Sequence, residues 1–155
     1  MTIEIGTPAP AFDMETDAGR VSLAALAGKT VVLYFYPKDD TPGCTNEGKD
    51  FSALLPQFAE AGAVVIGASK DSVKAHARFR AKYDLKVELG SDPEAKTIAA
   101  FDSWVQKSLY GRQYMGIDRS TFAIDGSGVI RAIWRKVKVA GHAAEVLAAV
   151  NSAQT

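Results

Sequence analysis

The only cysteine of the chain, Cys44, lies where a helix is expected to begin. The residues around it read PKDDTPGC, from Pro37 to Cys44. Thr41 is a favourable N-cap residue, and Pro42 suits the first helical position, where its missing N–H costs nothing. Cys44 would then occupy the third helical position, where free backbone amides and the positive end of the helix dipole favour a thiolate over a thiol. The spacing therefore predicts a reactive cysteine.

The neighbours of Cys44 also fit a reacting sulfur. Gly43 leaves the backbone beside the sulfur uncovered, so a small substrate could approach it. The Thr41 hydroxyl, one turn back, could hydrogen-bond either the sulfur or the substrate. The alternative is that Cys44 is a small buried core residue, the commoner fate of an intracellular cysteine. A cysteine framed by Thr, Pro and Gly at a helix start is a poor core filler, so we favour the nucleophile.

The elements that must position Cys44 follow from the hydrophobic pattern. The run TVVLYFY at 30–36 is β-branched and aromatic without alternation, which indicates a central strand covered on both faces. Asp92 is the expected cap of a short helix with Pro93 at its first position. We expect extended segments at 11–14, 20–23, 30–36, 63–68, 120–124 and 129–134. Helices are expected at 41–61, from a cap at Asp71 or Ser72 to about Tyr83, at 93–101 and at 142–151. This order predicts an α/β fold, a mixed sheet with helices on both faces.

Composition limits the classes of function. A length of 155 residues with 47% hydrophobic residues indicates one globular domain, residues 1–155. Lys plus Arg balance Asp plus Glu at 18 each, so there is no charge footprint for nucleic acid or an anionic membrane. No apolar run is long enough to span a bilayer, and the N-terminus has no secretory pattern. A cytoplasmic location is the default expectation.

The segment PKDDTPGC resembles the active-site pattern of the peroxiredoxins. The continuation CTNEGKDF and the later LYGRQYMGIDRSTFAIDGSG are similar to the bacterioferritin-comigratory, or Q-type, subfamily. The resemblance runs from about Pro8 to the last helix. It implies a thioredoxin-like fold with a central mixed sheet flanked by helices and an N-terminal β-hairpin extension. It also implies a thiol-dependent peroxidase that uses no metal and no organic cofactor.

The resemblance assigns roles to five residues of this sequence. Cys44 matches the peroxidatic cysteine, whose thiolate attacks a hydroperoxide oxygen and becomes a sulfenic acid. Thr41 matches the active-site hydroxyl, and Pro37 matches the proline that shields the pocket. Arg119 matches the active-site arginine, and Glu47 matches a glutamate that orients it. An arginine here fits the chemistry, because breaking the O–O bond builds negative charge on the departing oxygen.

The sequence departs from the two-cysteine members of the subfamily. The two places where such members carry a resolving cysteine are Lys49 and Arg80 here. With one cysteine, no internal disulfide can form, so an external thiol must reduce the sulfenic acid. Thioredoxin, glutaredoxin, glutathione and another small thiol all remain open as reductants. The resemblance favours a monomer, with a homodimer also possible.

Two other functions compete with peroxidase activity. A disulfide oxidoreductase lacks support because the chain has no Cys-x-x-Cys motif. A peroxide-sensing or redox-relay protein on the same fold shares the first chemical step and stays the alternative.

Several polar and aromatic residues are expected to take no part in the chemistry. His76 and His142 are expected on solvated helix faces, too isolated for a metal site. Asp39 and Asp40 are expected to be solvated loop acids. A group between the third helix and the next strand is expected mainly to pack, with a pocket rim or dimer contact as the alternative: Trp104, Leu109, Tyr110, Tyr114 and Met115.

Overall fold

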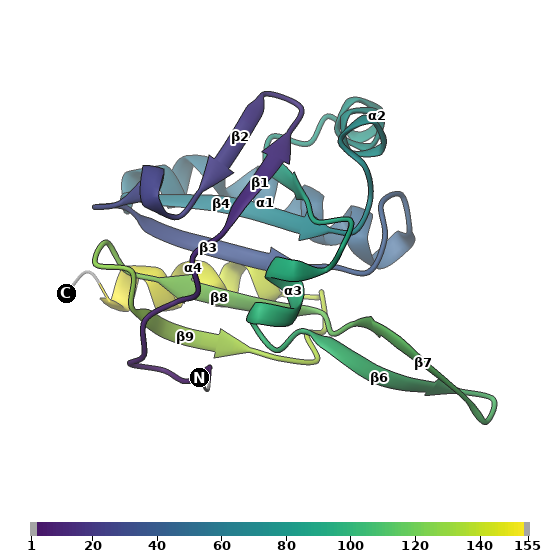
Figure 1. The fold of residues 1–155 in the computed structure, drawn as a ribbon. Helices are drawn as coiled ribbons and strands as arrows, with labels where there is room; N and C mark the ends of the chain where they lie inside the picture. The colour runs from purple at the N-terminus through teal and green to yellow at the C-terminus, as the bar shows by residue number, and fades with distance from the viewer. Residues whose placement is uncertain (1–2, 154–155) are drawn as a thin grey trace.

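The computed structural model describes residues 3–153 and contains a seven-stranded mixed sheet (Figure 1). Its central strands β3 (Thr30–Phe35), β4 (Ala63–Ser69) and β5 (Glu88–Ser91) are parallel. The outer strands pair in antiparallel fashion: β8 (Ser120–Ile124) with β3, β9 (Ile130–Trp134) with β8, β1 (Asp13–Thr16) with β5, and β2 (Gly19–Ser22) with β1. The expected mixed sheet and N-terminal hairpin are both confirmed.

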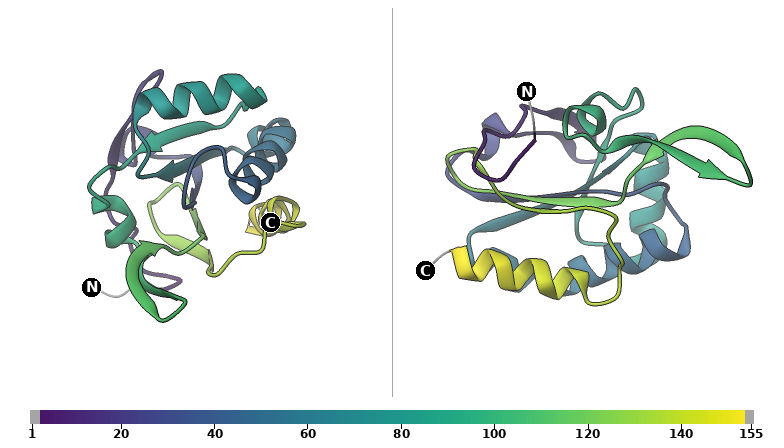
Figure 2. Two further views of the ribbon diagram at one scale, coloured as in Figure 1. Left: turned by 90° about the vertical axis from the view of Figure 1, so that its right-hand side faces the viewer. Right: turned by 90° about the horizontal axis from the view of Figure 1, so that it is seen from below.

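Two hydrophobic layers enclose the sheet, one on each face. Along β3, Val31, Leu33 and Phe35 belong to one layer, whereas Val32 and Tyr34 belong to the other. The second layer is covered by α1 (Pro42–Glu60), α2 (Val73–Tyr83) and α4 (His142–Ala153), and α1 and α4 pack side by side (Figure 2). The first layer is covered by α3 (Lys96–Ala100) and the β1–β2 hairpin. Helices therefore lie on both faces, as expected.

A separate hairpin of β6 (Trp104–Leu109) and β7 (Arg112–Ile117) projects from the body of the molecule (Figure 1). It was not predicted, because its turn is Tyr110-Gly111, both with positive φ, rather than the Asn-Gly or Asp-Gly typical of such turns. The expectation that its aromatic and apolar residues pack was largely wrong. Trp104 packs against the core, but four others are exposed: Leu109, Tyr110, Tyr114 and Met115.

The short helix expected at 93–101 begins later, at Lys96, so Pro93 is not its first residue. The residues before it form a turn, and Ala95 has a left-handed backbone with φ 58°. Asp92 nevertheless satisfies the first amides, because its carboxylate accepts hydrogen bonds from Lys96 N at 3.1 Å and Ile98 N at 2.8 Å. The N-cap residue is Ala95, so both the predicted cap and the predicted helix start were wrong, although the Asp92 carboxylate still binds amides of the first turn.

The strand β5 was also missed, since its four residues ELGS contain a single large apolar side chain. The other helices and strands lie within a few residues of their predicted positions. Among the described residues, no helix combines the length and apolar character needed to cross a bilayer.

Candidate active site

The start of α1 places Cys44 against the sheet. Thr41 is the N-cap residue, with an extended backbone (φ −100°, ψ 155°), and Pro42 is the first helical residue. Cys44 therefore occupies the third helical position, and it is only 2% exposed. The helix begins directly after the loop that follows β3, so the end of a central strand fixes the position of the sulfur.

The Thr41 hydroxyl does not cap the helix by its side chain. It donates a hydrogen bond to the Lys38 carbonyl at 2.7 Å. The proton of the hydroxyl is thus used within the loop, and its oxygen is left to act as an acceptor. Pro37 lies exposed at the start of this loop. A shielding role for Pro37 stays a prediction.

Arg119 reaches the sulfur from the neighbouring strand. Because β8 pairs antiparallel with β3, with Ser120 opposite Phe35, the residue just before β8 lies beside the end of β3. Arg119 Nη2 donates to the Cys44 Sγ at 3.4 Å. A Cβ at Gly43 would lie 3.1 Å from this nitrogen, so the glycine gives the guanidinium room to approach the helix end. The sequence predicted that Gly43 leaves room for a substrate, and it did not predict that Gly43 leaves room for Arg119.

Glu47 holds the other side of Arg119. It lies one turn after Cys44 on α1 and is 1% exposed, and its Oε1 accepts from Arg119 Nη1 at 2.6 Å. Burial raises the pKa of Glu47 to about 7, although the Arg119 charge opposes the shift. Burial also disfavours the charge of Arg119, but Glu47 and Cys44 together raise its pKa above the ordinary value. We call Cys44, Glu47 and Arg119 the sulfur cluster.

The structure thus brings Cys44, Glu47 and Arg119 into contact. It places Thr41 at the head of the same helix, with its hydroxyl turned to the loop backbone, and leaves Pro37 at the surface. This arrangement can hold a Cys44 thiolate next to the fixed positive charge of Arg119. The same charge can stabilise a negative charge that develops on a substrate atom beside the sulfur.

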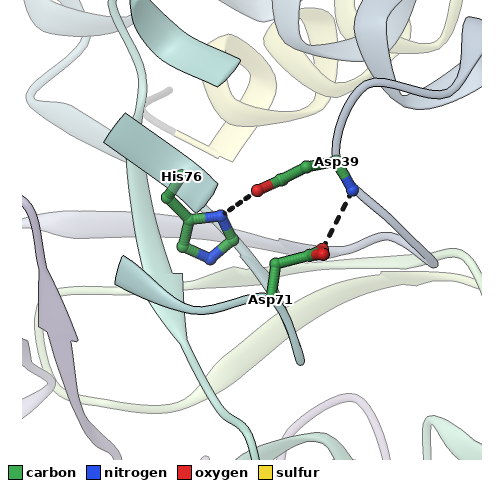
Figure 3. A group of neighbouring side chains, drawn as sticks. All are labelled: Asp39, Asp71 and His76. Carbon is green, nitrogen blue, oxygen red and sulfur yellow. Dashed lines mark hydrogen bonds and ion pairs between the residues drawn. The ribbon is translucent and has the colours of Figure 1, made fainter. Parts of the chain in front are cut away.

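A second buried cluster holds the loop that leads to Thr41. Asp39 Oδ2 lies 2.6 Å from His76 Nδ1, and Asp39 Oδ1 accepts from the Tyr36 hydroxyl at 2.6 Å. Asp71 Oδ2 accepts from the Asp39 backbone N–H at 2.9 Å (Figure 3). It also accepts from the Ser69 hydroxyl. We call Tyr36, Asp39, Asp71 and His76 the loop cluster.

The loop cluster corrects two expectations from the sequence. His76 is completely buried rather than solvated, and Asp39 is buried as well; only Asp40 is an exposed loop acid, bonded to Lys82 and Tyr83. The ligand atoms of Asp39, Asp71 and His76 lie within 4.8 Å of one another, close enough to hold a metal ion. Their hydrogen bonds to each other and to the neighbouring strands account for this grouping without one. No signal in the sequence linked Asp39 to His76, since the two are 37 residues apart.

His142 was also expected on a solvated face, and this was wrong. It is 4% exposed, and its Nε2 lies 2.8 Å from the Thr121 hydroxyl on β8. Burial lowers the pKa of His142, and the positive charge of Arg119 adds to this effect.

The two positions that could have carried a resolving cysteine lie at the surface. Lys49 is exposed on α1, with its Nζ 5.1 Å from the centre of the Tyr83 ring. Arg80 lies on α2, where its Nη1 donates to both carboxylate oxygens of Asp17 at 2.6 and 2.7 Å. Both side chains are engaged in contacts of their own.

Comparisons with known proteins agree with this geometry. A model of the AhpC/TSA family matches residues 5–133. The chain is 52% identical over 148 residues to a putative peroxiredoxin bcp of Coxiella burnetii, covering 95% of this chain and 98% of the relative. It is 51% identical to the peroxiredoxin Bcp of Bacillus subtilis, covering 95% and 94%.

A solved structure is similar over nearly the whole chain. The bacterioferritin comigratory protein of Xanthomonas campestris superposes with a TM-score of 0.89 at 48% identity, covering 93% of this chain and 92% of that one. That structure concerns the alkyl peroxide reduction activity of the Xanthomonas protein. The likeness confirms the thioredoxin-like fold that the sequence implied.

Proposed function

The chain belongs to the AhpC/TSA family and is a thiol-dependent peroxidase of the peroxiredoxin type. We propose that Cys44 is the only reacting cysteine and that a thiol from another molecule is its reductant. One observation carries the proposal. The only sulfur of cysteine in the chain lies at a helix N-terminus, 3.4 Å from a guanidinium that is itself held by a buried carboxyl group.

In the first half-reaction, the Cys44 thiolate attacks the terminal oxygen of a hydroperoxide. An S–O bond forms and the O–O bond breaks, so the sulfur is oxidised to a sulfenic acid. The departing oxygen leaves with the electron pair of the O–O bond and takes a proton from solvent to give water or an alcohol. Arg119 stabilises the thiolate before the attack and the departing oxygen during it.

In the second half-reaction, a thiol attacks the Cys44 sulfenic acid, which forms a mixed disulfide and releases water. A second thiol then attacks the mixed disulfide and returns the Cys44 thiol. No second cysteine exists in the chain to take either step. Cys44 is only 2% exposed, so a bulky thiol cannot reach its sulfur directly. We therefore favour a small thiol as the reductant; a protein thiol would require the start of α1 to open locally.

The finer features of the proposal follow from this cycle. Organic hydroperoxides are included as substrates because the similar Xanthomonas protein has alkyl peroxide reduction activity. A lone thiol that depends on external reductant fits a reducing compartment, so we place the protein in the cytoplasm. We propose a monomer or a weak homodimer, which sedimentation at several protein concentrations would distinguish.

Peroxide consumption with a panel of thiol reductants tests the proposal. Thioredoxin, glutaredoxin, glutathione and dithiothreitol are each supplied to the wild type and to Cys44→Ser. We expect turnover with at least one thiol for the wild type and with none for the variant. Oxidation of Cys44 without turnover by any thiol would support the peroxide-sensing alternative instead.

Excess peroxide without thiol gives a second test. The sulfenic acid then has no partner and is oxidised further to sulfinic or sulfonic acid. We expect the intact mass to increase by two or three oxygen atoms and the activity to be lost. A protein that gains no oxygen under these conditions would contradict a sulfenic acid that waits for an external thiol.

A further inference from the structure

We propose that Glu47 is a positioning residue that acts through Arg119 in its neutral, protonated form, and that its ionisation weakens the reaction with peroxide. The inference rests on the proposed function, because it concerns the rate at which Cys44 reacts. It goes beyond an orienting contact, since it assigns the reactive state of the site to one protonation state of a buried acid.

The charges of the sulfur cluster lead to this inference. A single guanidinium contacts two acids, the Cys44 sulfur through Nη2 and the Glu47 carboxyl through Nη1. If both acids ionise, the buried cluster carries one net negative charge, which burial disfavours. If Glu47 holds a proton, the thiolate and Arg119 neutralise each other. Burial therefore favours one proton on Glu47 while Cys44 is a thiolate.

The second carboxyl oxygen of Glu47 supports the same conclusion. Within residues 3–153, Oε2 is buried and has no hydrogen-bond partner. An ionised carboxylate would leave a charged oxygen desolvated and unpaired, whereas a carboxylic acid carries no such charge. In agreement, the pKa of Glu47 is raised to about 7 by burial, even though Arg119 lowers it.

The groups around Glu47 act in both directions. Asp50, exposed on the same helix, raises the pKa of Glu47, and Arg119 at the start of β8 lowers it. Tyr34 on β3 is buried nearby, and burial followed by the Glu47 charge raises its own pKa well above the usual value, so it stays neutral. Burial lowers the pKa of His142 on α4, with Glu145 opposing the shift and Arg119 adding to it, so His142 adds no positive charge near neutral pH.

The protonation state of Glu47 decides how much of the Arg119 charge serves the reaction. Attack on the peroxide moves the negative charge from sulfur to the departing oxygen, and both atoms need the guanidinium. An ionised Glu47 competes for the same cation and stabilises the ground state only. The rate should therefore fall with rising pH as Glu47 ionises.

The second-order rate with hydrogen peroxide, measured by stopped flow between pH 5 and pH 9 as rough limits, tests this. We expect the wild-type rate to fall on the order of tenfold above neutral pH. Glu47→Gln, which keeps the shape and cannot ionise, should lose this fall. A wild-type profile without a fall would overturn the proposal, and so would a Gln variant that is slower by the same factor at every pH.

Asp50→Asn is the matched control, because it removes an exposed acid three residues after Glu47 on α1, and no hydrogen bond or ion pair joins Asp50 to Arg119. Its maximal rate should equal that of the wild type, and its falling limb should move to lower pH, since a charge that raises the pKa of Glu47 is gone. A falling limb that moves to higher pH would contradict the assignment to Glu47.

Infrared difference spectra between acidic and alkaline pH give a readout that needs no peroxide. The carbonyl band of a protonated carboxylic acid should disappear near neutral pH in the wild type and be absent in Glu47→Gln. If this band disappears as expected but neither the wild type nor any variant reacts with peroxide, the peroxidase proposal fails, whereas the titration of Glu47 is supported. A reaction with peroxide without the band would sink the present inference alone.

Discussion

Two buried clusters flank the loop between β3 and α1, and they differ in how completely their polar atoms are paired. In the loop cluster, both carboxylate oxygens of Asp39 and both ring nitrogens of His76 have partners, the last being the Gly90 carbonyl at 3.1 Å. In the sulfur cluster, one oxygen of Glu47 has none among the described residues, and Arg119 is 17% exposed. Both clusters join a carboxyl group to a nitrogen-bearing side chain, an imidazole in one and a guanidinium in the other.

This difference in pairing suits the loop cluster to a structural role and the sulfur cluster to a chemical one. A carbonyl oxygen only accepts hydrogen bonds, so His76 Nε2 carries a proton toward Gly90, and His76 and Asp39 share another through Nδ1. Nothing in that arrangement is free to react. The sulfur cluster keeps one unpaired acid oxygen among the described residues and a cation that is partly exposed, so its charges can be redistributed when a substrate reacts.

The largest expected effect comes from breaking the fully paired cluster. His76→Ala leaves the Asp39 carboxylate buried without its partner, which should lower the free energy of unfolding by about 3–5 kcal/mol. Urea denaturation monitored by circular dichroism measures it. Lys74→Ala, at an exposed position of the same helix, is the control and should change stability little. An equally small loss for His76→Ala would mean that the loop cluster does not hold the fold.

Arg119→Ala should give the opposite balance, a large loss of rate with a smaller loss of stability than His76→Ala, because a protonated Glu47 left without its partner carries no charge. The second-order rate with peroxide should drop on the order of a hundredfold or more, as when a preorganised charge-stabilising group is removed. Arg112→Ala, an exposed arginine of β7, is the matched control and should keep the wild-type rate. Stopped-flow traces with an unchanged rate for Arg119→Ala would remove Arg119 from the site.

These two clusters were not equally visible in the sequence. The helix start at Thr41 and Pro42, and so the position of Cys44, followed from local rules that act over a few residues. Arg119 and Glu47 were named through a family resemblance, and their contact with the sulfur needed the pairing of β8 with β3.

The loop cluster depends on packing between distant segments, which no local pattern records. His76 looks like any polar residue of a surface helix until α2 lies against β5 and turns it toward Asp39. The projecting β6–β7 hairpin was missed for a different reason. Its turn residue Tyr110 adopts a positive φ that the sequence gives no cause to expect.

Glu47→Gln should sharpen the comparison through the pH dependence of stability. The pKa of Glu47 is raised to about 7 in the folded protein from 4.5, so the fold favours the protonated acid. That contribution is complete below the unfolded pKa and is lost as pH rises through about 7. The stability of the wild type relative to Glu47→Gln should therefore fall between these two pH values. A difference that is constant with pH in urea denaturation would contradict a titrating Glu47.

The smallest effect is expected at a third pair of a carboxylate and a nitrogen-bearing side chain, Asp17 and Arg80, which joins α2 to the β1–β2 turn. Its side chains are 25% and 20% exposed, so solvent screens the charges, and Arg80→Ala should cost less than about 1 kcal/mol. Asp17→Ala should cost a similar amount, and the double variant little more, because each single change already removes the pair. If Arg80→Ala destabilised the protein as much as His76→Ala, pairing with solvent contact would hold the fold as well as buried pairing, and the distinction between the clusters would fail.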